Sequence, residues 1–294
     1  VTDAPVEPPT QKGIFGFGNT GSYTAITNLV NSSGVIATDV TGVGTVRESL
    51  AAAAYGVDKA IFAYGYTGSV SSLSNLVNNS GVVASDVAGV GSARRSLAAA
   101  GYGGDKAIFG YGDTGSDTAI TNLVTNAGVI GTDVTGVGTA RKNIAAAAYG
   151  GDKAIFAYGS GVTAVSNLVN SSGVVGSDVT GVGTAREGLR GAGYGVGLAI
   201  FAYGIVSTNP GVSMSNLCNS SGVIATDVTG VGTARYYPGA TRYGGDKAIF
   251  AYGYNGSNVS MSNLVNSSGV VATDVTGVGT ARRSLAAAGY SSSA

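Results

Sequence analysis

The stretch GYGGDKAIFGYG, residues 101–112, decides the fold because it is repeated along the chain. It returns as AYGGDKAIFAYG at 148–159 and as YGGDKAIFAYG at 243–253. In the copy at 59–65, strand alternation places Ala60, Phe62 and Tyr64 on one face and Ile61 and Ala63 on the other. Both faces are apolar, so this short run predicts a β-strand that is covered on both sides.

The core of this stretch, Ile-Phe-x-Tyr-Gly or its Phe variant, occurs six times at intervals of 45 to 49 residues. Its copies begin at Ile14, Ile61, Ile108, Ile155, Ile200 and Ile249. Each interval holds four short segments of strand length, separated by Gly, Asn or Ser. A helix through SLAAAAYG, 49–56, is the competing interpretation, but the run is too short for a stable helix and ends at glycine. The pattern predicts an all-β fold, a six-bladed β-propeller of four-stranded antiparallel blades.

The two ends of the chain are expected to complete one blade together. The chain starts on a second strand, KGIFGFG at 12–18, and ends on a first strand, RRSLAAAGY at 282–290. Closure of the ring by both termini would remove exposed sheet edges. We therefore expect a propeller over residues 12–294, with repeats starting near 12, 59, 106, 153, 198 and 247. Residues 1–11 are rich in proline and are expected to form an extended arm.

One loop per repeat varies in length, whereas the rest of the repeat is constant. From the glycine that closes the core motif to the next Asn-Leu, the separation is 10, 10, 10, 8, 12 and 10 residues. A fixed frame with one variable loop per repeat is typical of a scaffold that binds a protein or glycan partner through these loops. The alternative is that the loops are merely unconstrained. The candidate contact residues are Tyr23, Tyr66, Asp113, Asp117, Asn209 and Tyr254.

Two charged positions recur in all six repeats, an Asp and, eight residues later, an Arg. They are Asp39 and Arg47, Asp86 and Arg94, Asp133 and Arg141, Asp178 and Arg186, Asp227 and Arg235, and Asp274 and Arg282. A ring of arginines at a tunnel mouth could bind an anion. Presence in every repeat favours a structural ring instead, in which each Asp satisfies backbone N–H groups in its turn or pairs with an Arg.

Composition narrows the classes of partner. Lys plus Arg equals Asp plus Glu, at 16 each, which gives no general attraction to nucleic acid. No apolar run has the length of a membrane-spanning helix, so membrane insertion is not expected. The single cysteine, Cys218, stands where other repeats have valine and is interpreted as a buried apolar side chain.

No set of residues suggests catalysis. The chain has no histidine, which excludes a histidine-based triad and copper-binding histidines of the galactose oxidase type. The Asp-Lys pairs of the GGDK segments are interpreted as turn residues, and GVGTAR lacks the lysine and helix of a phosphate-binding loop. We therefore expect no enzyme, no cofactor and no metal.

The order of features resembles the kelch family, in which an Arg-Ser stretch with small residues leads into an aromatic strand, as in ARRSLAAAGYGGDKAIFGYG at 93–112. The segments KAIFGYG, NLV and TGVGTAR more specifically resemble repeats in virion or tail structural proteins of tailed bacteriophages, cyanophages among them. These resemblances imply a structural or receptor-binding part of a phage particle, at the virion or an extracellular surface, with other virion proteins as further partners. The alternative is a general kelch-like interaction module.

Overall fold

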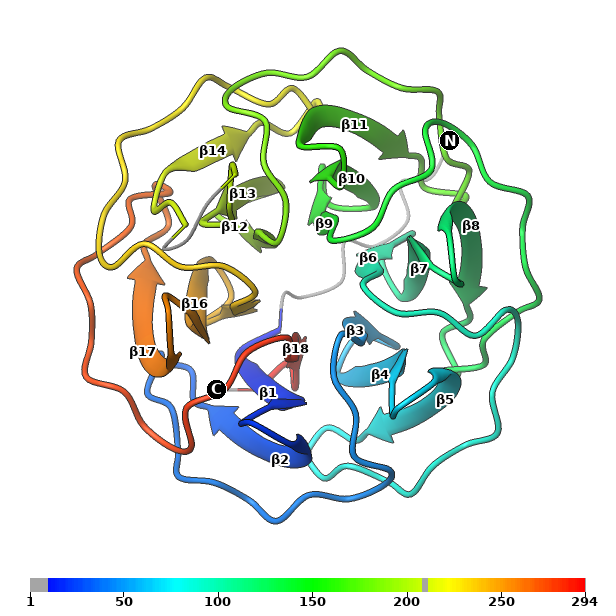
Figure 1. Cartoon of the computed structure of the whole chain (residues 1–294), viewed down its shortest axis with the longest axis horizontal. Coiled ribbons are helices and arrows are strands. Elements are labelled where there is room, and N and C mark those ends of the chain that lie inside the picture. Colours follow the sequence, from blue (N-terminus) through cyan, green and yellow to red (C-terminus); the bar gives the residue numbers. More distant parts are fainter. Residues whose placement is uncertain (1–9, 208–210, 294) are drawn as a thin grey trace.

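The computed structural model describes residues 10–207 and 211–293, and these residues form only strands and loops. Eighteen strands among them make six antiparallel sheets of three strands each. The six sheets are arranged around a common centre, like sectors of a disc (Figure 1). No helix in this part of the chain has the length and apolar character needed to cross a membrane. The prediction of an all-β fold is confirmed.

Each sheet has an inner strand near the centre, a middle strand and an outer strand (Figure 1). The inner strands are β3 (Ala51–Tyr55), β6 (Ala98–Tyr102), β9 (Ala145–Tyr149), β12 (Arg190–Tyr194), β15 (Gly239–Tyr243) and β18 (Ala286–Tyr290). The middle strands are β1 (Lys12–Asn19), β4 (Lys59–Tyr66), β7 (Lys106–Asp113), β10 (Lys153–Gly159), β13 (Leu198–Ala202) and β16 (Lys247–Tyr254). The outer strands are β2 (Tyr23–Val30), β5 (Val70–Val77), β8 (Asp117–Val124), β11 (Thr163–Val169), β14 (Ser215–Cys218) and β17 (Asn258–Val265).

The middle strands are covered on both faces, but their last aromatic residue lies on the face opposite to the one expected. Ala60 and Phe62 pack in one cluster, whereas Ile61 and Tyr64 pack in another. The reason is a β-bulge after Ala63, where Tyr64 has a φ of +65° and the register with β5 shifts. The bulge turns the Tyr64 ring toward the neighbouring sheet.

Small side chains line the centre of the disc because the inner strands approach one another closely. A Cβ atom on Gly191, for example, would lie 2.7 Å from the carbonyl oxygen of Ala146 in the adjacent inner strand. Alanine is therefore found here in spite of its low β-propensity, because larger side chains would not fit. The alanine run at 49–56, for which a helix was the competing interpretation, contains strand β3.

The fourth strand predicted for each repeat is present only as isolated bridges. After β2, the chain pairs with that strand at Val30 with Ile36 and at Thr27 with Val40. Between these bridges the side-chain amide of Asn28 donates to the carbonyl oxygen of Ala37 at 3.0 Å. In a continuous fourth strand, this carbonyl oxygen would accept a hydrogen bond from a backbone N–H. Here the side chain of Asn28 takes the place of that backbone donor.

The two ends of the chain lie in the same sheet, which has the order β18-β1-β2 (Figure 1). Phe15 pairs with Ala287, and the N–H of Gln11 donates to the carbonyl oxygen of Ser291 at 2.7 Å. Thr10 is buried and accepts a hydrogen bond from Gly245. The expected arm, residues 1–11, is therefore too long by Thr10 and Gln11, because both form hydrogen bonds with the repeats. Residues 1–9 of the expected arm lie outside the described residues.

Two closed rings of backbone hydrogen bonds join the six sheets around the centre. In the first ring, the N–H of the residue two positions before each inner strand donates to the carbonyl oxygen of its equivalent in the neighbouring repeat, at 2.7–3.1 Å. Its members are Ser49, Ser96, Asn143, Gly188, Tyr237 and Ser284, all with positive φ. The second ring, at the other end of the inner strands, is completed through both termini by Gly244 to Gln11 and Ser291 to Asp58. Closure is thus built into the backbone as well as into the sheets.

Candidate functional site

The variable loops connect each middle strand to its outer strand, at 20–22, 67–69, 114–116, 160–162, 203–214 and 255–257. Because the strands are antiparallel, these loops lie at the end of the sheets opposite to the Gly-Asp-Lys hairpins that join inner and middle strands. We call this end the variable-loop face. Of the six residues predicted as contacts, Asn209 lies outside the described residues, and the other five lie on or just beneath this face.

An aromatic and cationic group spans three neighbouring repeats on this face. The rings of Tyr23 and Tyr66 are in edge contact, with centroids 6.0 Å apart. The guanidinium of Arg95 lies 4.6 Å from the centroid of the Tyr66 ring. Half-buried aromatic rings with a polar end and a cation beside them are common in binding surfaces.

Next to Arg95, further charged side chains form a network of ion pairs. Arg95 lies 3.5 Å from the carboxylate of Asp113, and Lys142 Nζ lies 3.2 Å from Asp113 and 3.3 Å from Asp117. Ser160 donates its hydroxyl to Asp117 at 2.5 Å. Burial acts to raise the pKa of Asp113, but hydrogen bonds from Gly115 and Lys142 and the two nearby cations outweigh it, and the pKa lies below its usual value. Asp113 is buried, so its role is to hold the two cations, while Asp117 is half-exposed.

A second aromatic group lies on the same face in the sheet β15-β16-β17, which is next to the sheet that holds Tyr23. The ring centroid of Tyr236 lies 5.5 Å from that of Tyr254 and 5.1 Å from that of Tyr237. Arg283 lies 4.5 Å from the Tyr254 ring centroid. Tyr254 and Tyr66 therefore have the same local environment, a cation against the ring, in repeats that are far apart in the sequence.

One position of the repeat was not among the residues predicted from the sequence. It supplies the cations of this face and Tyr236. It is the residue directly after the invariant arginine, and it forms a bridge with the end of the middle strand in most repeats. Its occupants are Glu48, Arg95, Lys142, Glu187, Tyr236 and Arg283. The signal was visible in the sequence, since this is a position next to an invariant residue whose charge changes from repeat to repeat.

The six recurrent arginines have no exposed surface. Arg47 shows their environment: Nε donates to the carbonyl oxygen of Tyr64 at 2.9 Å, and Nη2 donates to Asn75 at 2.6 Å. Its guanidinium lies 4.3 Å from the Phe17 ring centroid of the adjacent sheet. Burial lowers the pKa of Arg47 to about 10, which leaves it charged at neutral pH. Its donors are used inside the fold, between two sheets.

The recurrent aspartates bond across repeats and not to the arginine eight residues later. Asp86 accepts hydrogen bonds from the N–H and the hydroxyl of Thr45, at 2.9 and 2.6 Å, and lies 3.8 Å from Arg47. Asp39, at the start of the ring, accepts the equivalent bonds from Thr280 at its end. Each aspartate therefore links the loop before a sheet to the segment after the same sheet. Asp39 links the two ends of the chain in this way.

Because of these aspartates, we expect the free energy of unfolding to fall in acid. Burial acts to raise the pKa of each carboxyl, but hydrogen bonds from hydroxyl, amide and backbone N–H groups and the nearby arginine lower it below the ordinary 3.8, as for Asp178. A lowered folded-state pKa contributes stability that is complete above the unfolded value and is lost as the pH falls through the folded value. Urea unfolding at neutral pH and at about pH 4 and 3 is expected to show a falling free energy of unfolding. The Asp178→Asn variant should be less stable at neutral pH and should lose less on acidification; an equal loss in both proteins would contradict this.

The remaining sequence candidates have local roles. In the Gly-Asp-Lys hairpins, each lysine lies close to its own aspartate, as for Lys59 and Asp58 at 3.4 Å. Cys218 is buried beside Ala199, and burial raises the pKa of its thiol to about 12, so it is a thiol and not a thiolate at neutral pH.

No protein-family model matches the chain, and no curated protein matches it either. Among solved structures, it is similar to a novel fungal alcohol oxidase with catalytic diversity among the AA5 family, determined in complex with copper. The TM-score is 0.54 and the sequence identity is 12%; the match covers 94% of this chain and 65% of the oxidase. The chain thus spans about 65% of the length of that structure. At this identity, the similarity shows a shared fold.

The prediction that the chain is not an enzyme is corrected by this finding, because an enzyme is built on the same fold. The fold therefore gives no reason to exclude catalysis. The residues of this chain do not fit a copper centre, however. Copper is held mainly by imidazole and sulfur ligands, and the chain has no histidine and one buried cysteine. Within residues 10–207 and 211–293, no group of three or more Cys, Asp or Glu side chains is placed to hold a metal ion.

Proposed function

We propose that the chain is a six-bladed β-propeller that binds a protein or glycan partner through its variable-loop face, as a structural or receptor-binding part of a phage particle. Six sheets of equal register around one centre support the propeller assignment (Figure 1). The bridged segment after each outer strand is the incomplete fourth strand of a blade.

The observation that carries the binding role is the distribution of variation over the repeats. The buried arginines, the recurrent aspartates and the apolar middle strands are nearly the same in all repeats, and four of the six have the Asp-Lys pair of the hairpin. Loop length, aromatic residues and charge change on the variable-loop face, where Tyr66, Arg95 and Tyr254 are half-exposed. A rigid frame that presents unequal loops on one face is the arrangement in which binding surfaces are commonly built.

The setting in a virion rests on the likeness of the repeats to those of phage structural proteins. A closed ring with few charged residues and two rings of backbone bonds suits a part that must withstand an extracellular environment. Antibody raised against the chain is expected to decorate phage particles in electron micrographs. Labelling that stays with the host cell, away from particles, would favour the general kelch-like interaction module instead.

The binding face is tested by paired variants on the two faces of the disc. We expect Tyr23→Ala combined with Tyr66→Ala to weaken binding of the purified chain to a glycan array, or to isolated virion proteins, by about tenfold or more, because aromatic side chains carry much of the energy of binding surfaces. The matched control, Asp105→Ala combined with Lys106→Ala, changes the opposite face and should leave affinity unchanged. Loss of binding in the control with full binding in the tyrosine variant would place the functional surface elsewhere.

A further inference from the structure

Two arginines break the pattern of small residues in the inner strands. At the first position of these strands, Arg190 stands where the other five repeats have Ala51, Ala98, Ala145, Gly239 and Ala286. At the fourth position, Arg242 stands where the others have Ala54, Gly101, Ala148, Gly193 and Gly289. Neither substitution is required by the repeat, since the frame is formed without it elsewhere.

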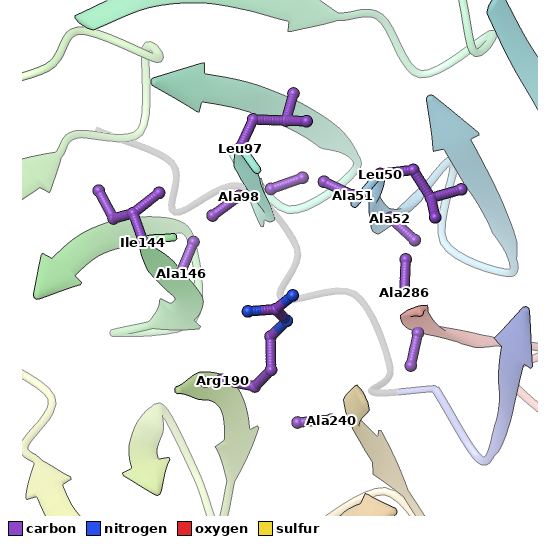
Figure 2. A pocket seen from close by; sticks show the side chains of 13 residues that line it. Leu50, Ala51, Ala52, Leu97, Ala98, Ile144, Ala146, Arg190, Ala240 and Ala286 are labelled. Carbon is purple, nitrogen blue, oxygen red and sulfur yellow. The ribbon is translucent and has the colours of Figure 1, made fainter. Parts of the chain in front are cut away.

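Arg190 projects into the centre of the disc. Figure 2 shows its guanidinium among the side chains of Ala98, Ala146, Ala240 and Ala286, which come from four other inner strands. The cavity at this point has a volume of about 40 Å³ and is lined mainly by alanine, with Leu50, Leu97 and Ile144 at its border. A cation thus lies in surroundings that are otherwise apolar.

The charge of Arg190 has no acidic partner in the described part of the chain. The hydrogen bond that its guanidinium makes there runs from Nη1 to the carbonyl oxygen of Leu189, at 2.8 Å. A guanidinium has five N–H donors, so most remain for another acceptor. Burial lowers the pKa of Arg190 to about 10, and Tyr237 is the ionisable neighbour that acts against this shift. The group is still charged at neutral pH.

Arg141, which is buried, and Arg242, which is half-buried, show how other arginines of this fold use their donors. Arg141 binds Asn167 and two carbonyl oxygens and lies 3.9 Å from Asp178. Arg242, at the opposite end of the inner strands, donates to the carbonyl oxygens of Gly195 and Gly245. Arg190 differs from these because it is half-buried and the described part of the chain offers its guanidinium one acceptor, the carbonyl oxygen of Leu189.

We propose that the centre of the disc binds a small oxoanion, whose oxygens accept hydrogen bonds from the guanidinium of Arg190. Carboxylate, phosphate and sulfate share the geometry that the planar fork of an arginine recognises. A water molecule needs about 10–15 Å³ of such cavity volume, so 40 Å³ suits a small anion and not a nucleotide. The site lies at the centre of the disc, at the end of the inner strands nearest the variable-loop face, because Arg190 pairs with Ala202, the last residue of β13.

Calorimetric titration of the full chain with inorganic phosphate, sulfate and acetate, at constant ionic strength set with chloride, tests this site. The wild type is expected to bind at least one of the three, and Arg190→Ala should weaken that binding at least tenfold. Alanine is already present at this position in four repeats, so the variant keeps the frame. The control Arg95→Ala removes the same charge from the variable-loop face and should keep the wild-type affinity.

The thermal midpoint gives a second measurement. Without the anion, Arg190→Ala should melt at or above the wild-type temperature, because a half-buried charge without an acidic partner is removed from an otherwise apolar centre. With phosphate or the preferred anion in excess, the wild type should rise in melting temperature and the variant should not. Absence of binding to the wild type for all three anions, or equal binding by Arg190→Ala, would overturn the proposal.

Discussion

Deletion of residues 1–18 is expected to leave no folded monomer. It removes Gln11 from the second backbone ring and all of β1 except Asn19, so β18 and β2 lose the strand between them. Ile14, Phe15 and Phe17 have no exposed surface. At about 1.5–3 kcal/mol for each large apolar side chain, their burial is worth about 5–9 kcal/mol, similar to the whole stability of a typical domain, about 5–15 kcal/mol.

Size-exclusion chromatography and circular dichroism measure this effect. The shortened chain should elute as aggregates, because two sheet edges and the apolar faces beside them become exposed. Deletion of residues 1–9 is the control, and it should leave the melting temperature nearly unchanged, since the bonds that close the ring begin at Thr10. A monomeric, cooperatively melting chain that lacks residues 1–18 would contradict the closure of the ring by both termini.

Replacement of Arg141 by alanine is expected to lower the free energy of unfolding by about 3–5 kcal/mol. The change leaves Asn167 and the carbonyl oxygen of Tyr158 without their donor, at about 1–3 kcal/mol for each buried group, and it opens a cavity beside the Tyr111 ring. The free energy should be measured by urea unfolding at neutral pH.

A double-mutant cycle then identifies the acidic partner. Arg141→Ala and Asp178→Ala should be coupled by about 1 kcal/mol, because the two groups lie 3.9 Å apart and share the loop at Thr139. Arg141→Ala and Asp133→Ala should be additive within about 0.5 kcal/mol, although these residues are only eight positions apart, because Asp133 binds Ser92 of the preceding repeat. Coupling in the second cycle and none in the first would mean that the aspartates act within their own turns.

Much of the architecture could be predicted from the sequence. The period of the Ile-Phe-x-Tyr-Gly motif indicated six units, and the middle strands begin at residues 12, 59, 106, 153, 198 and 247, the predicted starts. This was possible because the unit is repeated: six copies average out the ambiguity of a single short apolar run. The sequence also indicated that both chain ends share one sheet, because the first strand matches a middle strand of the repeat and the last matches an inner strand.

The candidate site was predicted only in part, because its residues meet across repeats. The lengths of the loops indicated where Tyr23, Tyr66 and Tyr254 would lie. Arg95 and Lys142 were missed, since a charged residue beside a strand end carries no sign of which residue in the preceding repeat it will contact.

What the sequence by itself determined is therefore the all-β repeat, its period, the apolar middle strands and the face on which variation is concentrated. Tertiary structure alone decided the β-bulge that turns Tyr64 to the neighbouring sheet, the pairing of Arg47 with Asp86 in place of Asp39, and the isolation of Arg190 at the centre. The physical reason is the same in each case. Local patterns report the alternation and length of a strand, whereas the partners of a polar side chain are set by how adjacent sheets pack, and these partners lie about 40 residues away in the chain or at its other end.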